Sequence, residues 1–538
     1  MVKKKYGVVY TPTRLADFVA QLLFDISTKE NYFVESILDP ACGECALLKA
    51  ASTQFGCSVQ YYGVDVDNDV ISCSDVYQIT HNDMILPTNV KRKSADYWKT
   101  KYPNLSLIIA NPPWSSEKIY EKEKLKKAGF TLIEGQYDSY VLFIELSLYL
   151  LADGGYFAFI IPDSLFDAQN ESLRRFLAEN TQIKVIARLG EKIFDEVNRA
   201  TTVIVCKKSK PNSSSITRCF RLTTDDRKTF LSSDTSLISF YNNQAHAVLQ
   251  TRFCNNESCN FDIDTHAEEE TTLNRIKSNT TRLSDYFIFG RGAEIAKAGN
   301  VVICPSCHHA QGFKKSQLDA GTKKCNKCKG DIFINSTTIQ QLITKAPSAN
   351  CVQIYVGENV HRYVISGELY IRLGVTGINY KNRGLYLPPK ILVRKTGLGI
   401  YAAIDYSGSM TSQTVYILKY KNCNIKIPLE YFLAILNSRV IYYYYLKTYG
   451  ENEWKSHPYL TKQIIFSFPI AKYEANDTDE RIIAISKELA ENYEYDKDIE
   501  LERLIMLKYG LTESDQQMIY DEMNRLPDLR AVNNMKVK

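Results

Sequence analysis

The feature that most limits the fold of this chain is a short apolar run that ends in two prolines. Leu105 to Ala110 (LSLIIA) has the length and composition of a buried strand, and Asn-Pro-Pro-Trp follows it directly. Proline has no backbone N–H to donate to a neighbouring strand, so the strand must end there. In an open α/β sheet, functional side chains follow the carboxyl ends of the strands. The run therefore predicts an α/β sheet with a site at Asn111.

The Asn-Pro-Pro-Trp segment itself predicts a clamp for an NH2 group. The prolines fix the backbone, so the Pro112 carbonyl and the Asn111 side-chain oxygen are two rigid acceptors. An amine or amide whose lone pair is delocalised is a poor nucleophile. Two acceptors that bind both of its N–H hydrogens favour a pyramidal nitrogen, and the lone pair is then localised on that nitrogen. Trp114 offers a flat face to a planar substrate such as an extruded base. The four residues also fit an ordinary turn at a strand end.

Three strand ends upstream predict a nucleoside pocket. A strand at 34–39 ends in a tight glycine turn, where a ligand can approach bare backbone. A second strand at 59–64 is followed by an acid placed to accept hydrogen bonds from ribose hydroxyls. A third strand end carries an acid that could hold an adenine amine. The predicted cofactor-binding residues are Asp39, Pro40, Ala41, Gly43, Asp65 and Asp83.

In this order, the motifs resemble those of gamma-class (Taq-type) DNA adenine-N6 methyltransferases that use S-adenosyl-L-methionine (SAM). In that family the motif that closes over the cofactor precedes the glycine turn, as Gly7 to Leu23 does here. Asp153 to Phe166 and Leu189 to Cys206 match the family's next segments, and Phe194 lies where the family has a second aromatic against the flipped adenine. A looser resemblance continues at 388–397 and 430–439.

The resemblance implies a Rossmann-like SAM-dependent methyltransferase sheet and a C-terminal mixed α+β target-recognition domain. It implies SAM as co-substrate and a flipped adenine of double-stranded DNA as the methyl acceptor. It also implies a restriction-modification or phage-defence role, with a separate restriction nuclease or defence subunit as a partner. The catalytic residues would be Asn111, Pro112, Trp114 and Phe194, and the further cofactor-binding residues Tyr10, Thr11, Pro12 and Asn111.

Two CxxC pairs in the C-terminal half predict a zinc ribbon at 301–332. They are separated by 17 residues, within the range of four-cysteine zinc modules. Four thiolates complete a tetrahedron around one Zn²⁺ and leave no open position, so the metal should be structural. The predicted ligands are Cys304, Cys307, Cys325 and Cys328. A further CxxC, Cys42 and Cys45, could indicate a redox motif but fits the cofactor turn better.

Charge and composition predict the remaining organisation. The net charge is +6 over 291–330, +9 over 360–465 and −7 over 473–538, which favours a DNA-facing domain in the C-terminal half. We expect a catalytic domain at 1–207, a connector at 208–281, the recognition domain at 282–472 and an acidic helical region at 473–538. No secretory segment follows Met1 and no apolar run reaches 18 residues, so we expect a cytoplasmic, nucleoid-associated protein.

Alternative functions share the same chemistry. A protein-glutamine methyltransferase uses the same clamp on a side-chain amide, and an RNA adenine or DNA cytosine-N4 enzyme is chemically close. From another class, a DNA-specificity subunit could carry a vestigial methyltransferase domain or need a partner to act. The intact motifs argue against a vestigial domain, and the basic C-terminal half argues against a protein substrate.

Overall fold

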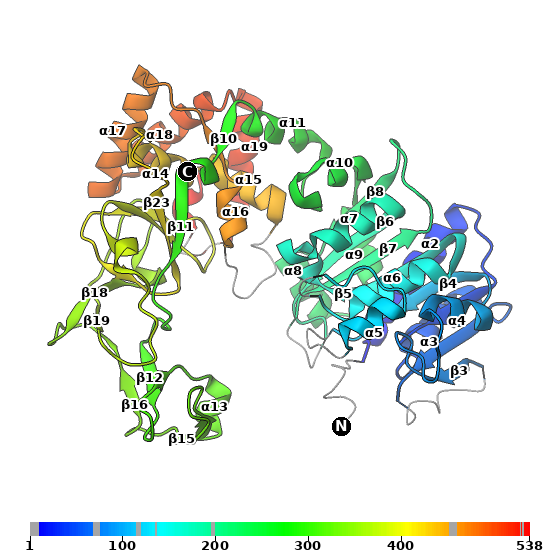
Figure 1. Ribbon diagram of the computed structural model, residues 1–538. Helices are drawn as coiled ribbons and strands as arrows, with labels where there is room; N and C mark the ends of the chain where they lie inside the picture. Colours follow the sequence, from blue (N-terminus) through cyan, green and yellow to red (C-terminus); the bar gives the residue numbers. More distant parts are fainter. Residues whose placement is uncertain are drawn as a thin grey trace. The chain divides into compact units, whose positions relative to one another are not determined.

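The structure is a computed structural model that describes residues 10–67, 76–114, 120–134, 137–194, 199–450, 460–527, 529 and 532–537. The chain divides into two compact units (Figure 1). The first contains Met1–Ala267 and Lys447–Ser456, and the second Glu268–Leu446 and His457–Lys538.

The first unit is built on a nine-stranded mixed sheet with the order β3-β2-β1-β4-β5-β7-β6-β8-β9. The five strands from β3 to β5 are parallel, whereas β7 runs antiparallel to both of its neighbours. The strands are β1 (Ser36–Asp39), β2 (Gln60–Asp65), β3 (Gln78–His81), β4 (Leu105–Ala110), β5 (Leu151–Pro162), β6 (Gln182–Gly190), β7 (Thr201–Lys207), β8 (Ile216–Arg221) and β9 (His246–Leu249).

Helices cover both faces of this sheet. The helices are α2 (Thr13–Lys29), α3 (Ala46–Phe55), α4 (Ser94–Lys101), α5 (Lys122–Lys127), α6 (Tyr140–Leu150), α7 (Glu171–Asn180), α8 (Thr224–Ser232), α9 (Leu237–Gln244) and α10 (Gln250–Asn255). Along β4 the side chains alternate, so Leu107 and Ile109 pack with α2 and α3 while Ile108 packs with α4 and α6. Every residue of β4 is buried, as expected for a central parallel strand.

The strand order reverses between β1 and β4, because the chain leaves β1 toward β2 and returns on the other side at β4. Such a switch point leaves a crevice at the carboxyl ends of the two strands, where α/β proteins bind ligands. The predicted turn at 39–43 follows β1, and the predicted clamp at 111–114 follows β4. The fold therefore brings both motifs to one crevice.

The segment at 208–281, expected to be a connector, contributes to the sheet. Strand β8 pairs in parallel with β6, and β9 pairs antiparallel with β8. The first compact unit accordingly extends to Ala267, well beyond position 207. The pairing needs partners about 30 residues upstream, which local sequence patterns do not reveal.

Glu30, directly after α2, ties this helix to the sheet. Its carboxylate accepts hydrogen bonds from Tyr156 Oη (2.7 Å) and Lys207 Nζ (2.5 Å) and pairs with Lys184 Nζ (2.7 Å). Burial alone would raise the pKa of Glu30, but the hydrogen bonds from Lys184, Lys207 and Tyr156 lower it to about 2. The group is therefore ionised at neutral pH.

The second unit contains several small sheets. Two have four strands, in the orders β11-β23-β20-β21 and β17-β19-β18-β22, and one has the order β13-β12-β16. Its strands are β10 (Thr280–Arg282), β11 (Phe287–Arg291), β12 (Asn300–Ile303), β13 (Ala310–Gln311), β14 (Thr322–Lys324), β15 (Asp331–Phe333), β16 (Ile339–Gln341), β17 (Ile343–Thr344), β18 (Cys351–Tyr355), β19 (Tyr370–Arg372), β20 (Lys390–Arg394), β21 (Ala402–Asp405), β22 (Met410–Thr411), β23 (Val415–Tyr420) and β24 (Pro469–Ala471).

The acidic tail forms helices that belong to the same unit. The helices of this unit are α11 (Ala267–Lys277), α12 (Leu283–Tyr286), α13 (Lys315–Asp319), α14 (Leu429–Leu436), α15 (Arg439–Tyr449), α16 (Lys462–Phe466), α17 (Asp477–Glu491), α18 (Tyr495–Lys508) and α19 (Glu513–Asn524). Asp498 of α18 pairs with Arg362 (2.8 Å) and Arg439 (3.1 Å), and all three side chains are at most 1% exposed. Buried pairs of this kind are costly to break, so the tail is firmly attached.

Candidate active site

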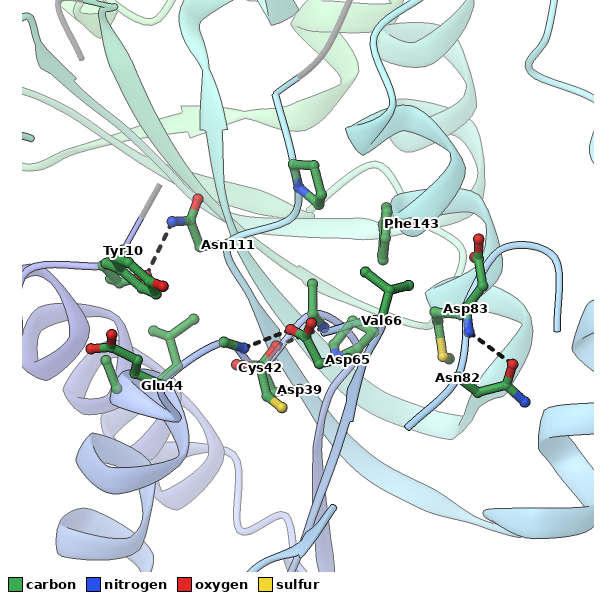
Figure 2. Close-up of a pocket in the computed structure, with 18 of the residues that line it drawn as sticks. Tyr10, Asp39, Cys42, Glu44, Asp65, Val66, Asn82, Asp83, Asn111 and Phe143 are labelled. Atoms are coloured by element: carbon green, nitrogen blue, oxygen red, sulfur yellow. Dashed lines mark hydrogen bonds between the residues drawn. The ribbon is translucent and has the colours of Figure 1, made fainter. Parts of the chain in front are cut away.

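The turn after β1 forms the floor of a pocket at the switch point (Figure 2). Gly43 has a φ of +46°, a conformation that glycine adopts readily. Its backbone N–H donates to Asp65 Oδ2 (2.8 Å), and the N–H of Ala41 donates to Asp39 Oδ1 (3.1 Å). The side chain of Asp39 is buried, which raises its pKa. Asp39 therefore shapes the turn from within the fold.

Asp65 is held rigidly at the end of β2. Besides the bond from Gly43, its Oδ1 accepts from the N–H of Asp67 (2.9 Å). A carboxylate can accept about four hydrogen bonds, so capacity remains for hydroxyl groups in the pocket. Because two backbone amides fix the carboxylate, its remaining lone pairs have defined directions. Asp65 thus fits the predicted role of holding a ribose.

Asp83 lies at the opposite end of the pocket from Tyr10 and Glu44 (Figure 2). Its Oδ1 accepts from the N–H groups of Ile85 (2.8 Å) and Leu86 (3.0 Å) and from the hydroxyl of Tyr120 (3.1 Å). Three donors on one oxygen fix the orientation of the carboxylate, as required for recognition of a particular amine.

Two apolar side chains lie beside Asp83. Val66 follows β2 directly, and Phe143 comes from α6 (Figure 2). Together they give the pocket a hydrophobic slot next to a fixed carboxylate, which suits a flat heterocycle with an amino group. The motifs alone did not identify either residue. Val66 could have been found as the apolar neighbour of Asp65, whereas Phe143 reaches the pocket only through the fold.

Asn111 lies at the end of β4 beside the N-terminal segment. Its Nδ2 donates to Thr11 Oγ1 (3.1 Å), which directs the amide oxygen away from Thr11. Tyr10 and Thr11 line the pocket, whereas Pro12 does not and instead precedes the first residue of α2. Gly7 to Val9 of the predicted closing motif lie outside the described residues. The hydrogen bond couples the predicted clamp to the predicted closing motif.

The backbone after Asn111 is fixed at two carbonyls. Ser139 donates its hydroxyl to the Pro113 carbonyl (2.5 Å), and Arg199 donates to the Trp114 carbonyl (2.7 Å). The Pro112 carbonyl, by contrast, accepts no hydrogen bond from any residue in the described ranges. This difference leaves the predicted acceptor open while its neighbours are tied down.

Trp114 and Phe194 are brought together by the fold. Their ring centroids are 5.2 Å apart at an interplanar angle of 85°, and the indole Nε1 donates to the Ile160 carbonyl (3.2 Å). Trp114 is 8% exposed and Phe194 3%. The two predicted aromatic residues thus pack edge to face against each other, and neither lines the pocket.

The pocket has a volume of about 860 Å³ when the space open to solvent at its mouth is included. It brings together nearly all of the predicted cofactor residues from separate strand ends. The predicted residues that line it are Tyr10, Thr11, Asp39, Pro40, Ala41, Gly43, Asp65, Asp83 and Asn111. The lining residues that were not predicted include Glu44, Val66, Asn82, Tyr120 and Phe143.

The thiol of Cys42, in the nearby Cys42–Cys45 pair, does not have the lowered pKa of a thioredoxin-type thiol. The hydrogen bond between Cys42 and Cys45 and the burial of Cys42 both raise the pKa of the Cys42 thiol. Reactive cysteines have lowered pKa values, since the thiolate is the nucleophile. Cys42 also packs against Gly63, where an added Cβ would lie 2.9 Å from the Cys42 sulfur. The pair lies in the segment between β1 and α3, and Cys42 lines the pocket.

The four predicted metal ligands converge in the second unit. Their sulfur atoms all lie within 4.8 Å of one another, with Cys304 to Cys328 at 3.5 Å and Cys307 to Cys325 at 3.7 Å. Zinc–sulfur bonds of about 2.3 Å in a tetrahedron place the sulfurs about 3.8 Å apart. The four thiols therefore fit a tetrahedral metal ion.

The two cysteine pairs have the same backbone geometry. In each, the N–H of the fourth residue after the first cysteine donates back to that cysteine's carbonyl, from His308 to Cys304 (2.9 Å) and from Lys329 to Cys325 (3.1 Å). Both His308 and Lys329 have positive φ, at +54° and +64°. Two identical tight turns facing each other are the expected architecture of a zinc ribbon.

Comparison with known families identifies the chain. The family model described as N-6 DNA Methylase matches residues 1–284, which is more than half of the chain. The chain belongs to this family. A second model, described as TaqI-like C-terminal specificity domain, matches residues 352–470. Together the two models confirm the predicted resemblance to Taq-type methyltransferases, and they leave residues 285–351, with the four cysteines, unmatched.

Curated relatives are similar over part of this N-6 DNA methylase. The methylase subunit of the type I restriction enzyme MpnII of Mycoplasma pneumoniae is 24% identical over 237 residues, covering 40% of this chain and 42% of the relative. The type II methyltransferase M.VspI of Vibrio sp. is 28% identical over 223 residues, covering 40% of this chain and 52% of the relative. The matched part spans about half the length of these relatives.

Solved structures share the fold over most of the chain. A nuclease-deletion mutant of the type ISP restriction-modification enzyme LlaGI, in complex with a DNA substrate mimic, has a TM-score of 0.54 at 13% identity, covering 90% of this chain and 47% of that one. The DrdV–DNA complex has a TM-score of 0.52 at 12% identity, covering 91% and 57%. Within the described ranges, no helix of this methylase combines the length and apolarity needed to cross a membrane.

Proposed function

We propose that this methylase transfers a methyl group from SAM to the exocyclic N6 amine of a flipped adenine in duplex DNA. The observation that carries the proposal is the Asn111-Pro112 pair of acceptors beside a pocket with two fixed carboxylates at the switch point of the sheet. The family assignment supports DNA adenine as the methyl acceptor, and the names of the curated relatives support a role in restriction-modification.

The pocket residues fit SAM along its length. Asp65 would accept hydrogen bonds from the ribose hydroxyls, and Asp83 would accept one from the adenine amine. The adenine ring would lie in the slot between Val66 and Phe143. The methionine part would lie toward Tyr10 and the glycine turn, where the carboxylate of Glu44 would suit its ammonium group.

The chemistry follows from the two acceptors. The amine of adenine is a weak nucleophile because its lone pair is delocalised into the ring. Hydrogen bonds from its two hydrogens to the Asn111 oxygen and the Pro112 carbonyl favour a pyramidal nitrogen and localise that lone pair. Both acceptors act most strongly as positive charge develops on the nitrogen in the transition state, so they lower the barrier. SAM supplies an electrophilic methyl group in this reaction.

The flipped base would stack at the Trp114–Phe194 pair. A base taken out of the duplex needs an aromatic or apolar surface to replace its lost stacking. The guanidinium carbon of Arg199 lies 5.9 Å from the centroid of the Trp114 ring, and Nη1 of the same group donates to the Trp114 carbonyl. We propose that Arg199 keeps this aromatic pair in place beside the clamp.

The four-cysteine cluster would hold one structural Zn²⁺. All four sulfurs would be ligands, so the ion would stabilise the fold of 301–332 and take no part in methyl transfer.

For the domain boundaries, we propose a catalytic domain that extends to Ala267, because β8 and β9 belong to its sheet, and a recognition domain that includes the acidic helices. A separate nuclease or defence subunit would be the partner.

A methyl-transfer assay with labelled SAM tests the proposal. The purified protein would be offered duplex DNA, RNA and a protein extract, and the labelled product would be identified after hydrolysis. We expect label only in DNA, as N6-methyladenine. Label in N4-methylcytosine, in RNA or in glutamine would assign the clamp to another substrate and contradict the proposal.

A further inference from the structure

A second groove lies within the range of the TaqI-like specificity model. It is formed by β18, the segment after β19, the residues around 380–387 and the loop from β21 to β22. The lining residues are Val352, Gln353, Leu373, Gly374, Tyr380, Lys381, Arg383, Tyr386, Leu387, Ser407, Gly408, Ser409 and Met410. Neither the motifs nor the comparisons assign a role to any one of them.

A chain of polar side chains runs along one side of this groove. It starts at Lys390, which is fully buried and pairs with Asp405 Oδ2 (2.5 Å). Asp405 Oδ1 accepts from the backbone N–H of Ser407 (2.7 Å), the Ser407 hydroxyl donates to Ser409 Oγ (2.6 Å), and Ser409 Oγ donates to Gln353 Oε1 (2.9 Å). A buried ion pair thus anchors a relay that ends on the carboxamide of Gln353.

The relay orients Gln353 toward the groove. Ser409 holds the oxygen of the Gln353 carboxamide. The NH2 group of the carboxamide makes no hydrogen bond with any residue that the structure describes. An unpartnered donor held in one orientation can recognise an acceptor on a ligand at little entropic cost. Glutamine is one of the side chains that read base edges in the major groove, and N7 and O6 of purines are acceptors there.

The charged residues of the groove differ in their availability. Lys381 is paired with Glu294 and is therefore committed within the protein. Arg383 is exposed and makes no ion pair or hydrogen bond with the residues that the structure describes. A free guanidinium beside a polar floor suits a phosphate group next to the base that is read.

The groove also has apolar walls. Leu373 and Met410 line it, and Leu387 at its edge is 60% exposed. Apolar side chains of this kind can contact the methyl group of thymine or the edge of a base step. The groove thus offers a polar group for a base edge, a cation for a phosphate and an apolar wall for a methyl group, which are the contacts that a base-reading surface makes.

We propose that this groove reads one base pair of duplex DNA. Gln353 would contact the base edge, Ser409 would act as its positioning residue through the relay to Lys390, and Arg383 would hold the neighbouring phosphate. The proposal rests on the proposed function in that it takes duplex DNA as the substrate, and it adds the residue that determines specificity at one position of the recognition sequence.

Selection from a random duplex library tests the groove without requiring catalysis. Full-length protein would be used to enrich bound duplexes, which would then be sequenced. We expect the wild type to enrich one short motif and Gln353→Ala to lose the preference at one position of it, with discrimination there reduced about 10-fold or more. Affinity for random duplex should stay within about twofold. Ser409→Ala should weaken the same position less.

Three further variants make the test specific. Gln517→Ala changes an exposed glutamine on α19 and should leave the motif unchanged. Arg383→Gln should weaken binding to all duplexes equally. If Gln353→Ala does not fold, Gln353→Glu replaces the amide donor by an acceptor and should change the preferred base at the same position.

The possible outcomes separate this proposal from the proposed function. A wild-type protein that enriches no motif would overturn the groove proposal, as would a Gln353→Ala protein that enriches the wild-type motif or loses affinity equally for all sequences. A wild-type protein that enriches a motif but methylates no DNA would contradict the proposed function and leave the groove proposal standing.

Discussion

Replacing Asn111 by alanine tests the amine clamp most sharply among single substitutions. The substitution removes one of the two acceptors and leaves the Pro112 carbonyl in place. By analogy with the loss of one transition-state hydrogen bond at an oxyanion, which costs about 2.7–4 kcal/mol, kcat should fall by about 10² to 10³. The side chain donates a hydrogen bond to Thr11, worth about 1 kcal/mol, and its loss should leave the protein folded.

Single-turnover methyl transfer and calorimetric binding of SAM measure the two effects separately. SAM affinity should change by less than about threefold, because the fixed carboxylates of the pocket carry most of the recognition. Thr11→Val keeps the shape but releases the Asn111 amide, and should lower kcat to a lesser degree. Asn180→Ala, which removes an amide on α7 away from the pocket, is the matched control. Near-normal turnover by Asn111→Ala would refute the clamp.

Three other predictions follow from the pocket, the cysteine cluster and the sheet. Asp65→Ala should weaken SAM binding by about 1.5–3 kcal/mol in calorimetry, with DNA affinity unchanged, and equal SAM affinity would remove Asp65 from the ribose site. Elemental analysis should find one Zn²⁺ per chain, and Cys325→Ser should abolish it and unfold 301–332 while SAM binding persists; zinc-free wild type would contradict the cluster's role. Because the pKa of Glu30 is lowered to about 2 in the folded state, its stabilising effect should be full above about pH 4.5 and disappear as the pH falls toward 2. Glu30→Gln should thus lose about 1–2 kcal/mol of unfolding free energy at pH 7 in urea titrations, and an unchanged difference between wild type and variant down to pH 2.5 would disprove the pairing.

The catalytic half was predictable because its motifs coincide with strand ends. The run at 105–110 is β4, residue for residue, and the turn at 39–43 follows β1 as predicted. Proline and glycine restrict the backbone locally, so these boundaries can be read without the fold. The four-cysteine cluster was predictable for a similar reason, since its spacing alone requires two facing turns.

The rest of the site depends on contacts between distant residues. Phe143 reaches the pocket from α6, and β8 joins the sheet by pairing with β6. Such contacts follow from the packing of whole elements and leave no local pattern.

The charge pattern was informative but incomplete. Among the basic residues counted in 360–465, Arg362, Lys390 and Arg439 are buried in ion pairs and cannot face DNA. Their acidic partners include Asp498 of the tail. Part of the positive charge of 360–465 and part of the negative charge of 473–538 therefore neutralise each other inside the protein. Burial decides which charges face solvent, and the sequence does not show burial.

Sequencing the methylation of cellular DNA tests the central claim most directly. The protein and its Asn111→Ala variant would be expressed in cells without adenine methylation of their own, and single-molecule sequencing would map modified bases. We predict N6-methyladenine at one short sequence motif with the wild type and none with the variant. Unmodified DNA with the wild type, modification of cytosine, or the same adenine pattern with Asn111→Ala would contradict the account.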